Sequence, residues 1–165
     1  MLRLIAPLLM FVASVSSAEG VNNTEHYDVK VTMVATGLNH PWGLVFLPDG
    51  HMLVTERNTG AIRIVSKAGD VRAPLQGTPK VFANGQGGML DVAIDPDFKN
   101  NQRVYFSFAE PGDGGAGTSV GRGRLETNEN ALKDVEILFR QQPKTVGGRH
   151  FGSRLVFSPE GHLYI

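Results

Sequence analysis

The sequence of 165 residues contains no cysteine. This absence excludes disulfide bonds, thiolate metal sites and a cysteine nucleophile. The chain also lacks an excess of charge of either sign, because 16 Lys and Arg residues balance 16 Asp and Glu residues. The basic residues are scattered along the chain, and we therefore expect neither nucleic acid nor an acidic membrane surface as a partner.

Long apolar runs are also missing, except for one at the N-terminus. Arg3 gives a positive start, residues 4–15 are almost entirely apolar, and Ser16-Ser17-Ala18 offers small side chains for cleavage. This pattern predicts a secretory signal peptide over residues 1–18, and the alternative is an uncleaved membrane anchor. We expect a mature protein that begins near Glu19, is periplasmic or secreted, and has no membrane span after cleavage.

Glycine and proline are abundant, with 20 and 9 residues, and they mark three similar stretches. Each stretch has a short apolar strand, a turn of proline and an acidic residue, and a second apolar strand; the stretches are residues 40–55, 88–107 and 152–165. Proline fixes φ at the first turn position, and the glycine that follows in the first and third copies can adopt the left-handed conformation. The sequence therefore predicts tight hairpins in these two copies and a longer connection in the second.

The spacing of the repeat favours a β-propeller. The turn prolines Pro48, Pro96 and Pro159 are 48 and 63 residues apart. Propeller blades recur at roughly 40–50 residues with four strands each, so the second interval requires an insertion. We place it in the glycine-rich residues 112–117, which are predicted to hold neither a strand nor a helix.

The remaining apolar segments indicate an all-β protein. Further strands are expected at residues 61–65, 104–108, 119–125 and 135–140. The third repeat stops at Ile165, within its second strand, and about two blades and part of a third cannot close a ring. We therefore interpret the sequence as the N-terminal fragment of a β-propeller; the alternative is a small complete β-sandwich.

Two loops are candidates for chemistry. His150 lies in the glycine-flanked residues 147–152, and a histidine held there is suited to proton abstraction near neutral pH. The alternative is an ordinary surface or packing histidine. In residues 85–88, glycines permit a backbone to approach a flat ligand closely, and Gln86 offers both a donor and an acceptor. The alternative here is an ordinary turn between blades.

Two other patterns predict no site. Residues 117–121 match the G-x-S-x-G motif of hydrolases but lack the strand-to-helix turn that the motif requires. The five histidines lack the close spacing of metal ligands, so no metal-binding residue is assigned in this chain.

Several motifs together resemble soluble PQQ-dependent aldose sugar dehydrogenases of the glucose/sorbosone dehydrogenase family. They are residues 36–50, 54–57, 85–98 and 150–157, and the likeness runs from about residue 31 to residue 165. The resemblance implies a six-bladed propeller, here partial over residues 31–165, after a signal peptide (1–18) and an N-terminal extension (19–30).

The resemblance also implies an activity. Family members are periplasmic or secreted, bind pyrroloquinoline quinone (PQQ) with calcium, and oxidise aldose sugars at the anomeric carbon to lactones, with an external electron acceptor. The family's catalytic histidine matches His150, and its cofactor-binding glutamine matches Gln86. Arg149 stands where related sequences tend to have glycine or an acid, and a cation there would affect the histidine and access for the sugar.

Most ligands of the quinone and calcium would lie beyond Ile165. The resemblance therefore implies an enzyme in the complete protein, and an inactive fragment in the 165 residues alone. A non-catalytic secreted propeller that binds a glycan or a protein partner remains the alternative function.

Overall fold

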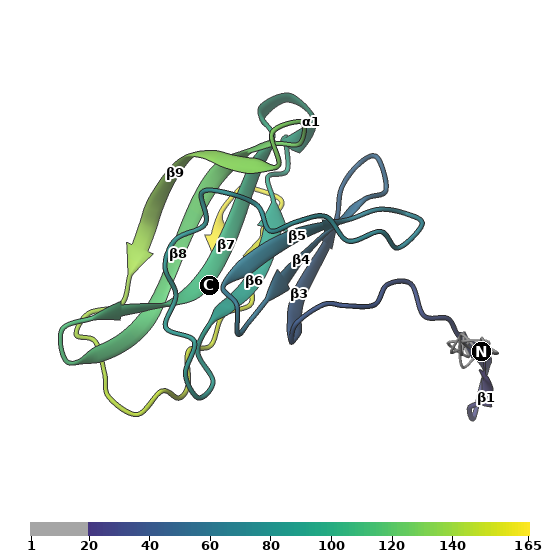
Figure 1. Cartoon of the computed structure of the whole chain (residues 1–165), viewed down its shortest axis with the longest axis horizontal. Coiled ribbons are helices and arrows are strands. Elements are labelled where there is room, and N and C mark those ends of the chain that lie inside the picture. Colours follow the sequence, from purple (N-terminus) through teal and green to yellow (C-terminus); the bar gives the residue numbers. More distant parts are fainter. Residues whose placement is uncertain (1–19) are drawn as a thin grey trace, which may run out of the picture. The chain divides into compact units, whose positions relative to one another are not determined.

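The computed structural model describes residues 20–165, so the predicted signal peptide lies outside the described residues (Figure 1). The chain divides into two compact units after Met33. The described part of the first unit holds one antiparallel hairpin, formed by β1 (Gly20–Asn23) and β2 (Asp28–Val31). The predicted boundary between residues 30 and 31 falls within β2. The remaining strands belong to the second unit, residues 34–165.

The first sheet of this unit is an antiparallel meander. Its order is β3 (Pro41–Phe46), β4 (Met52–Glu56) and β5 (Ala61–Val65). Gly50 closes the turn between β3 and β4 with a φ of 85°, which confirms the hairpin predicted there.

The second sheet has the order β6-β7-β8-β9. Its strands are β6 (Met89–Ile94), β7 (Arg103–Gly112), β8 (Gly115–Glu126) and β9 (Ala131–Arg140), and the short helix α1 (Phe98–Asn101) connects β6 to β7. The expectation that residues 112–117 hold no strand is wrong. Gly112 pairs with Gly115 across a two-residue turn. Gly114 adopts a φ of 81° in that turn, so the glycines permit a tight hairpin that lets the ladder continue through the run.

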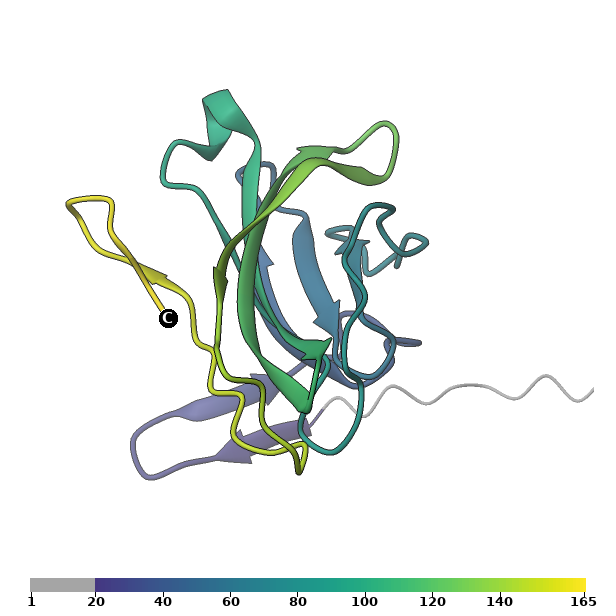
Figure 2. The same ribbon diagram turned by 90° about the vertical axis from the view of Figure 1, so that its left-hand side faces the viewer.

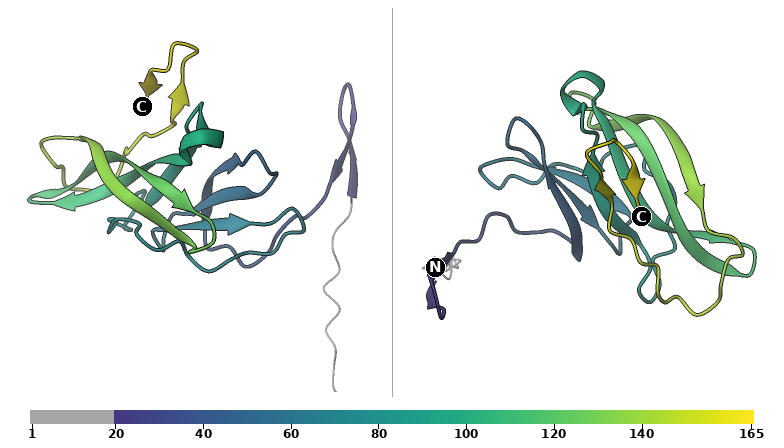
Figure 3. Two further views of the ribbon diagram at one scale, coloured as in Figure 1. Left: turned by 90° about the horizontal axis from the view of Figure 1, so that it is seen from above. Right: turned by 180° about the vertical axis from the view of Figure 1, so that it is seen from behind.

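A third hairpin follows at the end of the chain, formed by β10 (Val156–Phe157) and β11 (Leu163–Tyr164). In Figure 2 the sheet β3–β5 lies on one face of the sheet β6–β9, and the β10–β11 hairpin lies on the other; Figure 3 shows the same succession. The unit is therefore a stack of three successive antiparallel elements.

Apolar side chains fill both spaces between these layers. The larger cluster joins the first two sheets; it includes Leu53, Ile62, Ile64, Met89, Val104, Phe106 and Phe108. On the other face of the second sheet, Tyr105, Val120 and Leu155 are buried against the partly buried Phe157. Successive layers thus bury apolar faces against each other, as repeated units do. No helix among residues 20–165 is long and apolar enough to cross a membrane.

Candidate functional site

Two glycine-rich loops meet before the start of β6. The main-chain N–H of Gln86 donates to the carbonyl of Gly148 at 2.9 Å. The main-chain N–H of His150 donates to the side-chain Oε1 of Gln86 at 2.8 Å. The structure therefore brings together both predicted site residues, which are 64 positions apart in the sequence.

The first loop requires glycine at three positions, because a Cβ on Gly85, Gly87 or Gly88 would collide with a main-chain oxygen. Gly85 has a φ of +60°, and a Cβ there would collide with the carbonyl oxygen of Gly148. Gly88 has a φ of +138°, and a Cβ there would collide with the carbonyl oxygen of Arg57. Both contacts are with main chain, which cannot move aside as a flexible side chain can. These glycines thus let the loop pack closely against neighbouring main chain.

The second loop holds His150 in an unusual conformation. Its φ is 61°, in the left-handed region that non-glycine residues rarely adopt. Such a conformation persists where the surroundings fix it. Phe151 provides one anchor, because it is buried against Phe82 with ring centroids 6.3 Å apart. A second anchor is the hydroxyl of Thr118, which donates to the Phe151 carbonyl at 2.6 Å.

The two loops form one side of a pocket of about 340 Å³. It is lined by Trp42, Arg57, Gln86, Leu90, His150, Phe151 and Gly152. The imidazole of His150 makes no hydrogen bond within residues 20–165 and is exposed, so it is available to a ligand. Arg57 donates through Nε to Asn58 at 3.2 Å, and no lining residue carries a carboxylate. The pocket therefore offers a base, a cation and an aromatic face to a polar or anionic ligand.

A buried carboxylate, that of Glu56, lies at the end of β4, directly before Arg57 in the sequence. Glu56 is fully buried, and its oxygens accept from the main-chain N–H of Asn39 at 3.0 Å and the hydroxyl of Thr59 at 2.8 Å. Arg63 Nε lies 3.3 Å from the same carboxylate. Burial by itself raises the pKa of Glu56, but these hydrogen bonds and the Arg63 charge outweigh it and hold the pKa below its ordinary value. Glu56 is thus a charged structural anchor next to Arg57.

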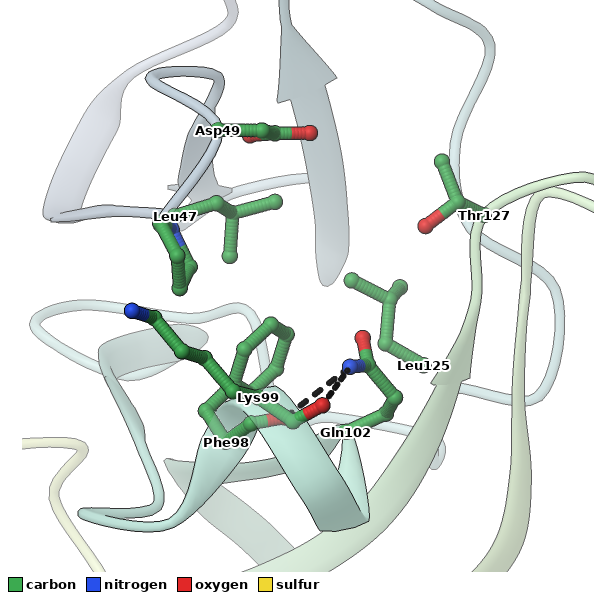
Figure 4. A pocket seen from close by; sticks show the side chains of 8 residues that line it. Leu47, Asp49, Phe98, Lys99, Gln102, Leu125 and Thr127 are labelled. Atoms are coloured by element: carbon green, nitrogen blue, oxygen red, sulfur yellow. Dashed lines mark hydrogen bonds between the residues drawn. The ribbon is translucent and has the colours of Figure 1, made fainter.

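A second pocket lies at the opposite end of β6 and lacks these features (Figure 4). It measures about 210 Å³ and lies between the β3–β4 turn, α1 and the end of β8. The side-chain amide of Gln102, the residue that follows α1, donates to the carbonyls of Phe98 and Lys99 within the helix. That group is committed to terminating the helix, and neither His150 nor Gln86 lines this pocket.

The other residues considered in the sequence do not line the pocket that contains His150 and Gln86. Ser119 of the G-x-S-x-G match lies within β8 and donates to Glu110, so it is not on a nucleophile turn. Arg149 is exposed. Residues 20–165 contain no group of three or more His, Asp or Glu side chains that could hold a metal ion.

Residues 38–165 match the family model described as glucose/sorbosone dehydrogenase. The chain belongs to this family. It is 48% identical over 139 residues to aldose sugar dehydrogenase YliI of Escherichia coli (strain K12), covering 83% of this chain and 37% of that protein. The chain thus spans less than half the length of this relative.

Two solved structures of glucose/sorbosone dehydrogenase relatives share the fold. The soluble aldose sugar dehydrogenase from E. coli in the apo-form aligns with a TM-score of 0.74 at 48% identity, over 79% of this chain and 38% of that chain. The PQQ-bound form of the aldose sugar dehydrogenase from Streptomyces coelicolor aligns with a TM-score of 0.68 at 30% identity, over 90% and 41%. The all-β class and the partial β-propeller expected from the sequence are confirmed.

Sequence reasoning missed part of this pocket. Trp42 and Arg57 line it, although they stand 44 and 29 residues before Gln86. Both belong to motifs that carried the family resemblance, but neither received a role. The position of Arg57 at the end of a strand-like segment could have indicated it as a site residue. Residues at strand ends often meet at one edge of a sheet.

The bond between Gln86 and His150 gives a direct prediction. Replacing Gln86 by alanine removes the acceptor of the His150 N–H, and we expect amide hydrogen exchange at His150 to accelerate by about fivefold, since one such bond contributes about 1 kcal/mol. NMR detection of exchange measures this. Gln141→Ala is the matched control, because Gln141 Oε1 accepts from the Thr118 N–H at 3.0 Å. That variant should accelerate Thr118 only; unchanged exchange at His150 in Gln86→Ala would contradict the assigned bond.

Proposed function

We propose that the protein, over the full length typical of its relatives, oxidises aldose sugars at the anomeric carbon to lactones with PQQ as cofactor. The observation that carries the proposal is the contact between Gln86 and His150 at the wall of one pocket. The membership of the chain in the glucose/sorbosone dehydrogenase family supports it. For the 165 residues by themselves we expect no turnover, since they span 37% of the E. coli relative.

The residues present fit a flat anionic quinone. Gly85 and Gly88 let the loop beside the pocket pack tightly against the main chain of Gly148 and Arg57. Arg57 supplies positive charge, and no carboxylate in the lining opposes it. Gln86 uses Oε1 for His150, which leaves its NH₂ group to donate to a quinone or sugar oxygen. Calcium accompanies PQQ in this proposal, and none of the described residues is assigned to it.

In the proposed reaction His150 is the general base. An imidazole nitrogen of His150 takes the proton of the anomeric hydroxyl while the anomeric C–H bond breaks and the lactone carbonyl forms. A bound quinone would supply the acceptor for the hydride, and an external acceptor would take up the electrons. Gln86 orients His150 through its main chain, and Trp42 offers an apolar face to the sugar ring. We place the enzyme in the periplasm or outside the cell, after removal of a signal peptide.

Reconstitution tests this function. The full-length protein should reduce a redox dye in the presence of an aldose only after addition of PQQ and Ca²⁺. Omission of either should abolish the reaction. Saturable PQQ binding without dye reduction by any aldose would contradict the proposed reaction. The absence of PQQ binding would favour a propeller that only binds a glycan or protein.

A further inference from the structure

The segment from His150 to Leu155 is attached to the second sheet by side chains. Within the described residues it makes no main-chain hydrogen bond to a strand of that sheet. Its main-chain groups are instead bonded to side chains: the hydroxyls of Thr118 and Ser107 donate to its carbonyls, and Asp91, with Gln86 in the loop before β6, accepts from its N–H groups. Each of these side chains therefore contributes individually to the position of the segment that carries His150.

Asp91 makes the most complete of these attachments. It lies on β6, is 1% exposed, and accepts from the main-chain N–H of Leu155 through Oδ2 at 2.7 Å. Its other oxygen, Oδ1, accepts from Arg154 Nη1 at 2.8 Å. The Asp91 N–H donates to the Ser107 hydroxyl at 2.9 Å, and that hydroxyl in turn contacts the carbonyl of Ser153 at 3.2 Å. One buried carboxylate thus fixes the end of the His150 segment at two adjacent residues.

Through Arg154 the same carboxylate also reaches Trp42, another lining residue of the pocket. The guanidinium carbon of Arg154 lies 5.4 Å from the ring centroid of Trp42, in a cation–π arrangement. The Arg154 side chain is 67% exposed, so solvent alone would leave it free to move, whereas the Asp91 side chain is 2% exposed and fixed. Gly43 permits this approach, because a Cβ there would lie 2.9 Å from Asp91 Oδ1.

We propose that Asp91 is a positioning residue of the active site, which holds His150 through the Leu155 main chain and Trp42 through Arg154. This inference rests on the proposed function. It assigns the two oxygens of Asp91 to two separate tasks. Oδ2 places the base and affects turnover, and Oδ1 places the aromatic wall and affects sugar binding.

Two substitutions separate these tasks in the full-length holoenzyme. Asp91→Asn retains an acceptor for the Leu155 N–H but loses the negative charge that holds Arg154. We expect KM for the aldose to rise roughly twofold to fivefold with kcat little changed, and Arg154→Gln should reproduce this result. Asp91→Ala loses both bonds, and we expect kcat to fall by about 10²-fold in addition, because small displacements of a catalytic group have effects of this size.

Asp95→Asn is the matched control, since Asp95 follows the other end of β6 and accepts from the Tyr105 hydroxyl at 3.0 Å, away from the pocket. It should leave kcat and KM unchanged. All rates are normalised to the quinone-binding fraction, so that loss of folded protein is not counted as loss of turnover. Wild-type kcat and KM in both Asp91 variants, with only a lower melting temperature, would overturn the inference and leave Asp91 a purely structural residue.

The positioning by Asp91 can be tested even if the proposed sugar oxidation is wrong. If the wild-type holoenzyme oxidises no sugar, amide hydrogen exchange at His150 and Leu155 tests the positioning directly. Asp91→Ala must then accelerate exchange at both amides and Asp95→Asn at neither. Unchanged exchange in Asp91→Ala would overturn the positioning as well.

Discussion

Replacement of His150 by alanine is expected to lower kcat for aldose oxidation by roughly 10²–10⁴-fold, the usual contribution of a general base. Among the described residues that line the pocket, His150 is the one with a side chain suited to act as a base, since the others offer a guanidinium, an amide or apolar groups. The melting temperature should stay nearly constant, since the imidazole is exposed and makes no hydrogen bond within residues 20–165. Initial rates of dye reduction at saturating PQQ measure the effect.

His162→Ala is the matched control for this experiment. His162 is also exposed, but it follows the turn between β10 and β11 and lines none of the pockets described above. It should retain the kcat of the unmodified enzyme. A His150→Ala enzyme as active as the His162→Ala enzyme would refute the assigned base.

Removal of the Glu56 carboxylate is expected to have the largest effect on stability. Glu56→Ala leaves the Arg63 guanidinium without its buried counter-charge, and it leaves the Asn39 N–H and the Thr59 hydroxyl without their acceptor. We expect the free energy of unfolding to fall by about 3 kcal/mol, at the low end for a broken buried pair because Arg63 keeps some exposure. Urea unfolding measures this. The exposed pair of Glu136 with Arg122 supplies the control, and Glu136→Ala should change the free energy by less than about 1 kcal/mol.

The stabilisation by Glu56 should depend on pH in a defined direction. Its pKa in the folded protein lies below the ordinary value of 4.5, so its contribution is fully present above that ordinary value. The contribution is lost as the pH falls through the lowered pKa of the folded state. The difference in unfolding free energy between the unmodified protein and Glu56→Ala should therefore be large at pH 7 and shrink below pH of about 4. A difference that stays constant down to pH of about 2 would contradict a charged Glu56.

Much of the fold could be predicted from local sequence because local chemistry determines it. The turn glycines Gly50 and Gly161 adopt the left-handed conformation that their position after proline and an acidic residue predicts. The strand at residues 61–65 has the predicted bounds. The glycine-rich residues 112–117 were misjudged because cross-strand pairing in a long hairpin overrides the weak strand propensity of glycine.

The arrangement of the site residues could not be predicted from local sequence. His150 and Gln86 were selected separately, and only the family resemblance implied that they act together, because their contact joins loops 64 residues apart. Asp91 reads in the sequence as one acidic residue within an apolar strand. Its importance depends on Arg154 and Leu155, which approach it only in the folded chain.

The most direct test of the account is a crystal structure of the full-length protein with PQQ bound. The account predicts the quinone in the pocket lined by Trp42, Arg57, Gln86 and His150, with the His150 imidazole facing it and the Gln86–His150 bond retained. Quinone bound elsewhere on the propeller, with this pocket filled by other side chains, would contradict the central claim that these two loops form the active site.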